Sequence, residues 1–339
     1  MPPPKPLTAN DRHGAFFEPA ALEDRATEAM PDPRIAVLVP CRNEAATVAS
    51  VVADFRRSLS GCTVYVYDNG STDDTASRAH AAGAVVRHES RPGKGRVVRR
   101  MFAEIDADVY VLVDGDSTYD PLSAPGLVAA LQDGDCDMIT AVRDHEGRDA
   151  AYRRGHHFGN RAFGTILGLL FGSPASDPFS GYRAFSRRFV KSFPGSSRGF
   201  EIETELTVHA FEQSLPTGEV PSRYFERPAG STSKLATYRD GARILAKTIW
   251  LFKDVKPTIF FGAFALVFGV VGLLLGIDVI IEFMDTRLVR RLPTAVLATG
   301  LMLLAFLSMG CGLILDSVAR GRREAKRIAY LAAGSERGR

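Results

Sequence analysis

Apolar runs alternate with mixed segments along the first half of the chain. Five runs rich in Val, Ile, Leu, Tyr and Ala lie at 35–39, 64–67, 84–86, 109–113 and 138–142. Runs of this length and composition predict β-strands that are buried on both faces. The segments between the runs are typical of helices, such as the one expected at 45–59. We therefore predict an α/β fold in which helices cover both faces of a mostly parallel sheet.

Two longer apolar runs follow in the last third, at 258–277 and 292–315, and neither contains a charged residue. As helices, both are long enough to cross about 30 Å of hydrocarbon, whereas soluble core helices are usually shorter. The alternative is a pair of buried core helices. The connection between the runs has three Lys or Arg residues, while 231–256 has six and 316–339 has seven. This distribution predicts a hairpin in the inner (plasma) membrane with both ends and the bulk of the protein in the cytosol.

The segment before the hairpin has the periodicity of an amphipathic helix. Apolar residues recur at three- and four-residue steps: Leu235, Tyr238, Ala242, Leu245, Ile249 and Phe252. Basic residues lie largely off this stripe, and Trp250 fits an interfacial anchor. We expect the helix to lie in the headgroup layer, although packing on the soluble domain would use the same pattern.

These patterns divide the chain into five segments. They are a mobile N-terminal extension (1–33), an α/β domain (34–230), an interface helix (231–256), a transmembrane hairpin (257–316) and a basic cytosolic tail (317–339). The formal net charge of the whole chain is only +3, so no nucleic-acid partner is expected. The four cysteines have no C-x-x-C spacing, which favours a reduced environment over a disulfide framework.

Polar clusters follow three of the expected strands at the points where they end. They are Pro40-Cys-Arg-Asn-Glu44, Asp68-Asn-Gly-Ser-Thr-Asp73 and Asp114-Gly-Asp116. An Asp-Gly-Asp triplet alone is also an ordinary turn. Because the carboxyl ends of parallel strands meet at one sheet edge, three clusters there indicate a single ligand site. Two carboxylates in that site suit Mg²⁺ or Mn²⁺ bound together with a diphosphate.

Together with G-K-G at 93–95 and D-P-F-S-G-Y-R at 177–183, these clusters resemble the nucleotide-sugar-dependent glycosyltransferases of family 2, which have a GT-A fold. The resemblance covers residues 35 to about 230 in order and spacing. F-E-I-E-T-E at 200–205 and S-K-L at 233–235 further resemble the polyprenyl-phosphate branch. That branch contains the dolichyl-phosphate mannose synthases and relatives with a membrane hairpin.

The resemblance implies roles for the motif residues. Pro40 and Glu44 would line the nucleoside pocket, with Glu44 accepting hydrogen bonds from the ribose hydroxyls. Asp68 would hydrogen-bond the base, and Lys94 would close over the nucleotide.

The same resemblance assigns the metal site. Asp114 would lie beside the ribose and the metal, and Asp116 would be the main ligand of Mg²⁺ or Mn²⁺. Many relatives have a glutamine two residues after the second aspartate, where this chain has Thr118. The third protein ligand is therefore left open between Thr118 and a water molecule.

Transfer to a phosphate acceptor has requirements that do not depend on the family. A phosphate is already anionic near pH 7, so the site needs cations to hold two anionic substrates more than it needs a strong base. Arginine suits this task because its planar fork binds phosphate in a bidentate manner. By position we favour Arg143, Arg154 and Arg183. Asp177 would orient the acceptor or an arginine, with a turn cap as the alternative. Near the membrane, the candidate ligands of the lipid phosphate are Ser231, Ser233 and Lys234.

The sequence thus predicts a metal-dependent enzyme that transfers a hexosyl group, with inversion, from a UDP- or GDP-sugar to a polyprenyl phosphate. A processive polysaccharide synthase is the enzyme alternative, although the Q-x-x-R-W signature of that class is absent. A catalytically silent membrane scaffold with a transferase fold is the non-enzyme alternative. The sugar, the nucleobase, the lipid length and homo-oligomerisation stay open at this point.

Overall fold

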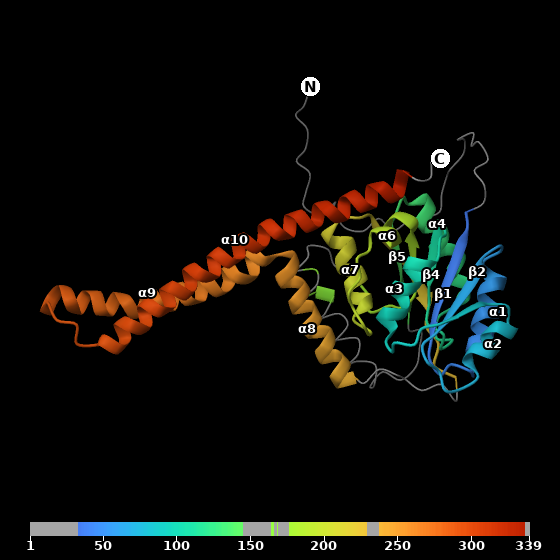
Figure 1. The fold of residues 1–339 in the computed structure, drawn as a ribbon, viewed down its shortest axis with the longest axis horizontal. Coiled ribbons are helices and arrows are strands. Elements are labelled where there is room, and N and C mark those ends of the chain that lie inside the picture. Colours follow the sequence, from blue (N-terminus) through green and yellow to red (C-terminus); the bar gives the residue numbers. More distant parts are fainter. Residues whose placement is uncertain (1–32, 145–163, 166–167, 169–175, 229–236, 336–339) are drawn as a thin grey trace, which may run out of the picture. The chain divides into compact units, whose positions relative to one another are not determined.

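The computed structural model describes residues 33–144, 164–165, 168, 176–228 and 237–335. Within these residues the chain forms a seven-stranded sheet of order β3-β2-β1-β4-β6-β5-β7 (Figure 1). The strands are β1 (Ile35–Cys41), β2 (Thr63–Asp68), β3 (Val85–His88), β4 (Val109–Leu112), β5 (Met138–Asp144), β6 (Arg183–Ser186) and β7 (Thr217–Arg223). Parallel pairing joins β1 to β2 and β4, β2 to β3, and β5 to β7. Strand β6 is antiparallel to both of its neighbours, so the predicted mostly parallel sheet is confirmed.

Helices cover both faces of this sheet (Figure 1). Those of the α/β part are α1 (Val48–Ser58), α2 (Thr75–Ala81), α3 (Lys94–Glu104), the 3₁₀ turn η1 (Pro121–Ser123), α4 (Ala124–Asp133), α6 (Arg187–Ser192) and α7 (Ile202–Glu212). Alternate residues of β1 face opposite cores: Val37 and Val39 pack with α1 and α4, while Ala36 and Leu38 pack with α3, α6 and α7. The uninterrupted apolar run of β1 is explained by this two-sided burial.

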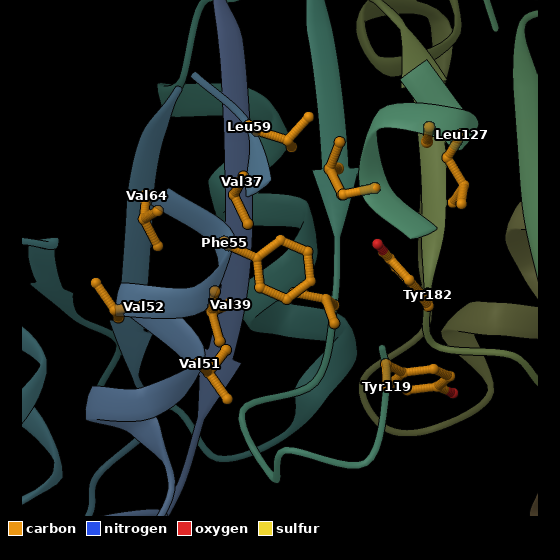
Figure 2. Close-up of a cluster of buried hydrophobic side chains, with 14 of the residues drawn as sticks. Val37, Val39, Val51, Val52, Phe55, Leu59, Val64, Tyr119, Leu127 and Tyr182 are labelled. Atoms are coloured by element: carbon orange, nitrogen blue, oxygen red, sulfur yellow. The ribbon is translucent and has the colours of Figure 1, made fainter. Parts of the chain in front are cut away.

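Buried side chains under α1 hold this helix in place at the edge of the sheet where the polar clusters lie. Phe55 is buried in the same cluster as Val51 and Val52, and its ring meets Tyr182 edge-on with centroids 5.8 Å apart (Figure 2). Burying a side chain of this size contributes about 1.5–3 kcal/mol. Helix α1 is therefore held firmly against β1, and the loop between them has fixed ends.

Two long helices follow: α9 (Pro257–Thr286) and α10 (Leu292–Ser335). Both are long and apolar enough to cross a membrane, and most of their large apolar side chains are exposed. They pack closely on each other, since a Cβ at Gly272 would lie 3.1 Å from the Cβ of Leu301. The apolar runs predicted at 258–277 and 292–315 thus form helices, but α10 continues far beyond 315.

The end of α10 contacts the α/β part of the protein, in a region that we expected to be a tail. The Tyr330 hydroxyl donates to Asp137 Oδ2 at 2.7 Å, and Lys326 Nζ lies 2.6 Å from Glu212 Oε2. Asp137 is fully buried, so this hydrogen bond is shielded from water. Through these contacts the polar end of α10 binds the α/β part, which its sequence alone does not predict.

Helix α8 (Thr237–Val255) precedes the hairpin and lies beside α7 (Figure 1). Leu251 and Val255 pack against Val208 of α7, whereas Leu245 and Ile249 of the predicted stripe are about half exposed. The helix therefore has two apolar faces. One belongs to the protein core, and the other is open within the part of the chain that the structure describes.

Candidate active site

The first two polar clusters are tied together at the carboxyl ends of β1 and β2. Asn43 has a left-handed backbone (φ 52°), and its side-chain oxygen accepts a hydrogen bond from Thr72 N at 2.8 Å. The Glu44 backbone N–H donates to Thr75 Oγ1 at 2.8 Å, and the Glu44 side chain is largely buried. Pro40 is partly buried at the end of β1, in register with Tyr67. Glu44 and Pro40 thus lie at the sheet edge where we expected the nucleoside pocket.

Asp68 and Asn69 organise the second cluster. Asp68 is buried, accepts hydrogen bonds from the backbone N–H and hydroxyl of Ser71, and lies 3.1 Å from His88 Nδ1. Asn69 Nδ2 donates to the carbonyls of Glu89 and Arg91, and Asn69 Oδ1 accepts from Gly93 N at 2.6 Å. Asn69 therefore fastens the loop before α3, which carries Lys94.

Lys94 joins two carboxylates in the interior of the site. Its Nζ lies 2.5 Å from Asp114 Oδ1 and 2.6 Å from Glu203 Oε1. Burial opposes the charge on Lys94, but the two carboxylates outweigh it and raise the pKa of Lys94 well above its usual value. Burial raises the pKa of Glu203, which Lys94 offsets only in part. The approach requires glycine at 181, where a Cβ would lie 2.5 Å from Asp114 Oδ2.

Asp116, the second carboxylate after β4, is paired with an arginine from a distant segment. Arg227 Nη2 lies 2.6 Å from Asp116 Oδ2, and Asp116 itself is only 3% exposed. The other oxygen, Oδ1, accepts from the Thr118 hydroxyl at 2.6 Å and from Thr118 N at 3.2 Å. In this structure Thr118 therefore orients Asp116.

The chain after β7 brings Arg227 to this position. Tyr224 forms an isolated antiparallel bridge with Tyr119, and their rings meet edge-on at 5.2 Å. Phe225 N then donates to the carbonyl of Thr118 at 2.8 Å. The segment 224–227 thus runs along the stretch that follows Asp116, which explains how residues far apart in sequence meet.

Arg143 and Asp177, both selected from the sequence, form a bidentate ion pair. Arg143 Nε lies 2.6 Å from Asp177 Oδ2, and Nη2 lies 2.7 Å from Oδ1. The guanidinium also stacks over the Tyr224 ring at 5.4 Å. Burial opposes the charge on Arg143, yet the Asp177 carboxylate outweighs it and raises the pKa of Arg143. Asp177 therefore orients an arginine, the role that we considered beside orienting the acceptor.

Arg183 is completely buried and does not reach the surface. Its guanidinium donates to the carbonyls of Ser180 and Pro178 at 2.9 and 2.7 Å and to Thr207 Oγ1 at 2.9 Å. These bonds hold the turn that contains Gly181. The sequence predicts Arg183 as a phosphate ligand, whereas the structure places it beneath the site as a support. The other predicted acceptor residues, Arg154, Ser231, Ser233 and Lys234, lie outside the described residues.

Three residues of this cluster were not among our sequence-derived site residues. Asn69 stands inside the D-N-G-S-T motif, and Glu203 inside F-E-I-E-T-E, so polar residues within a motif were the available signal. Arg227 had no such signal, because nothing in its local sequence distinguishes it from a surface arginine.

The carboxylate oxygens of the site suit a hard divalent cation. Within the described residues, no three His, Cys, Asp or Glu side chains are grouped to hold a metal on their own. Mg²⁺ and related ions are commonly bound by one or two carboxylates together with substrate phosphates and water. Asp114 and Asp116 match that pattern, and each already faces a positive charge in Lys94 and Arg227. The residues present therefore fit Mg²⁺ or Mn²⁺ bound with a diphosphate.

The mostly parallel seven-stranded sheet, with the antiparallel strand β6 and carboxylates at its carboxyl edge, has the GT-A-like architecture. Residues 36–193 match the family model described as glycosyl transferase family 2. The chain is 33% identical over 305 residues to the glycosyltransferase AglJ of Haloferax volcanii, covering 89% of this chain and all of that protein. It belongs to glycosyl transferase family 2.

Two further proteins resemble this chain over about two thirds of its length. A dolichyl-phosphate hexose transferase of Haloferax volcanii is 30% identical over 210 residues, which cover 62% of this chain and 90% of the relative. Among solved structures, glucosyl-3-phosphoglycerate synthase from Mycobacterium tuberculosis in complex with Mn²⁺ and UDP-glucose superposes with a TM-score of 0.54 at 25% identity. That match covers 66% of this chain and 79% of the synthase chain.

Proposed function

We propose that this protein transfers a hexosyl group from a UDP- or GDP-sugar to a polyprenyl phosphate at the cytosolic face of the membrane. The observation that carries the proposal is the pairing of Asp114 and Asp116 with Lys94 and Arg227 in a protein that also has two long apolar helices. The first feature suits an anionic, metal-bound donor, and the second suits an acceptor that stays in the bilayer. The relatives that act on dolichyl phosphate or bind UDP-glucose support both choices.

The donor would bind at the carboxyl ends of β1, β2 and β4. Glu44 and Asp68 would receive hydrogen bonds from the ribose and the base, and Pro40 would line the same pocket. Asp114 and Asp116 would hold Mg²⁺ or Mn²⁺, which neutralises charge on the leaving diphosphate when bound. Lys94 can move from Asp114 to a phosphate oxygen without leaving its second partner, Glu203, because it touches both.

The acceptor phosphate would meet the donor beside Arg143. Asp177 aims this guanidinium, and the planar fork of arginine suits a phosphate. An oxygen of the lipid phosphate attacks the anomeric carbon, the bond from that carbon to the diphosphate breaks, and the nucleoside diphosphate leaves with the bonding electrons. Attack from the opposite side inverts the anomeric configuration. The acceptor oxygen is already ionised, so no general base is needed. Arg154, Ser231, Ser233 and Lys234 stay part of this proposal as further phosphate ligands.

The helices supply the membrane side of the proposal. The isoprenoid tail cannot leave the bilayer, and the charged donor cannot enter it, so transfer must occur at the headgroup plane. Helix α8 leaves Leu245, Ile249 and Trp250 about half exposed, as expected for a helix that lies in the interface. Helices α9 and α10 would then anchor the protein directly beside the reaction plane.

Radiolabel transfer tests the proposal. Membranes that contain the protein and a polyprenyl phosphate are incubated with UDP-glucose, UDP-N-acetylglucosamine, UDP-galactose or GDP-mannose, with and without Mg²⁺ or Mn²⁺. At least one donor should give a chloroform-soluble, mild-acid-labile product that depends on the metal. The Asp116→Ala variant should be inactive while its thermal unfolding stays cooperative. A water-soluble polymer as the main product would indicate a processive synthase instead, and no product from any donor would indicate a scaffold.

A further inference from the structure

The loop at 196–199 lies directly on the G-K-G segment that carries Lys94. A Cβ at Gly93, whose φ is +130°, would lie 2.1 Å from the carbonyl oxygen of Arg198. A Cβ at Gly95 would lie 2.6 Å from the carbonyl oxygen of Ser197. The backbone of this loop therefore contacts the residues on both sides of Lys94, and a shift of the loop would remove this packing from the segment that carries Lys94.

Glu205 of α7 holds this loop in place. Its Oε1 accepts from the Ser196 backbone N–H at 3.0 Å and from the Ser196 hydroxyl at 2.7 Å, while Oε2 accepts from Ser197 N at 2.7 Å. Burial disfavours the charged form of Glu205, but hydrogen bonds from Ser197 and Ser196 outweigh this and lower the pKa of Glu205. The carboxylate is thus ionised and fully engaged with the loop. Glu203, two residues earlier, binds Lys94 itself.

Lys247 of α8 completes the cluster from the membrane side. Its Nζ donates to the Ser196 hydroxyl at 2.9 Å and lies 3.5 Å from Glu205 Oε1. The Lys247 side chain is only 14% exposed, so it is turned into the protein. The same ammonium group lies 4.7 Å from the ring centre of Trp250. A continuous set of contacts therefore runs from α8 through the loop at 196–199 to the segment that carries Lys94.

We propose that Glu205 and Lys247 are positioning residues that couple the docking of α8 to the binding of the nucleotide by Lys94. This inference rests on the proposed function in taking Lys94 as a ligand of the donor diphosphate. When α8 is seated, Lys247 and Glu205 hold the loop at 196–199 against Gly93 and Gly95. When Lys247 is removed, the Ser196 hydroxyl and Glu205 lose a cation, and Glu205 alone holds the loop less firmly against Gly93 and Gly95.

Lys253 provides a matched control on the same helix. It also lies near the Trp250 ring, at 5.4 Å, but its ion-pair partner is the adjacent Asp254. Replacing either lysine by methionine removes one positive charge beside Trp250 and keeps an unbranched side chain. Only the Lys247 substitution removes the contact with Ser196.

The test measures nucleotide affinity directly in the full-length protein in lipid nanodiscs. Titration with UDP and with GDP in the presence of Mn²⁺ first identifies which nucleotide the wild type binds more tightly. With that nucleotide, Lys247→Met should raise Kd about tenfold, within the usual range for coupling through an intermediate contact. Lys253→Met should change Kd less than about twofold, and Lys247→Arg should restore most of the affinity. Ser196→Ala removes only the hydroxyl. It should also raise the nucleotide Kd, without disturbing the fold.

The outcomes separate this inference from the proposed function. If the wild type binds neither UDP nor GDP, the proposed donor class is wrong and the coupling falls with it. If the wild type binds one nucleotide and Lys247→Met and Ser196→Ala bind it equally well, the coupling alone is wrong. An equal loss in both methionine variants would also overturn it, because the effect would then come from charge near Trp250. A rise in the KM for the lipid phosphate with an unchanged nucleotide Kd would assign Lys247 to the acceptor instead.

Discussion

Replacing Asp177 by asparagine should disable Arg143 while leaving its side chain in place. Asp177 is 3% exposed, and its two oxygens accept from Arg143 Nε and Nη2 at 2.6 and 2.7 Å. Asparagine has nearly the same shape, but it carries no charge and replaces one acceptor oxygen by an amide donor. That donor would face a guanidinium N–H, so one hydrogen bond is lost and the second loses its charge assistance.

The expected cost follows from the burial of the pair. Removing one partner of a fully buried ion pair costs about 3–5 kcal/mol, because the other charge stays uncompensated. The Arg143 side chain is 22% exposed and stacks on Tyr224, so water and the ring compensate part of that loss. We therefore expect the free energy of unfolding to fall by about 2 kcal/mol. Separately, an Arg143 that is no longer aimed loses a charge-assisted hydrogen bond to the acceptor phosphate, which is also worth about 2 kcal/mol and corresponds to about a thirtyfold fall in kcat/KM for the polyprenyl phosphate. The KM for the sugar nucleotide should change little, since Asp177 acts through Arg143.

A double-mutant cycle gives the decisive measurement. Asp177→Asn, Arg143→Ala and the double variant are compared by kcat/KM for the lipid phosphate, with thermal unfolding as a check on folding. If Asp177 works by aiming Arg143, the double variant should be no worse than Arg143→Ala alone. Losses that add up would show that Asp177 has a separate role. Wild-type activity in Asp177→Asn would show that the ion pair does not matter for the acceptor.

Two further predictions concern folding. Tyr330→Phe removes the hydroxyl that donates to Oδ2 of the fully buried Asp137, while Ser186 and Arg188 still bind Oδ1. Loss of this hydrogen bond to a charged group should lower the free energy of unfolding by about 1.5–3 kcal/mol, and an unchanged Tm in detergent would contradict this. The second prediction concerns His209, whose pKa is lowered to about 3 by burial, with a smaller contribution from Lys326. Below pH 6.5 the unfolded state therefore binds a proton at this histidine, whereas the folded state does not. Between pH 7.5 and 5.5 the free energy of unfolding of the wild type should fall by about 1.4 kcal/mol because of this group. In His209→Gln the fall over the same range should be smaller by that amount. Equal pH dependence of the unfolding free energy in both proteins would refute the assignment.

The parts of the fold that could be predicted are those whose local pattern is strong. The run at 35–39 is apolar at every position because β1 is covered on both faces. Strand β7 could not be read in this way. It is one of the two edge strands of the sheet and reads T-G-E-V-P-S-R, with a proline and few large apolar side chains. Proline is tolerated at such an edge, and only the pairing with β5 makes this segment a strand.

For Arg183, too, the local sequence pattern does not predict the environment of the side chain. An arginine in a polar turn predicts a solvent-exposed cation, and we accordingly placed it near phosphate. In the structure its guanidinium donates to Ser180, Pro178 and Thr207 and lies 3.5 Å from Met138 Sδ, all inside the protein. Burial lowers the pKa of Arg183, with partial compensation from nearby acidic groups that include Glu203 and Asp177. The positions of these carbonyl and hydroxyl partners depend on tertiary structure, so no local pattern could predict the burial.

In the candidate site, predictable carboxylates are paired with cations whose positions depend on the fold, and this pairing affects which ligands the site favours. Asp114 and Asp116 were identifiable as strand-end carboxylates, but their partners Lys94 and Arg227 come from α3 and from the segment after β7. Together with Glu203, the second partner of Lys94, these four side chains form a cluster of three carboxylates and two cations whose charges nearly cancel. A divalent cation and a sugar diphosphate that bind together add no net charge, whereas either one alone would add about two unit charges to a largely buried site, which is costly. The site thus favours the metal and the diphosphate as a pair, with Lys94 and Arg227 able to turn from the carboxylates to the phosphates as the cation takes their place.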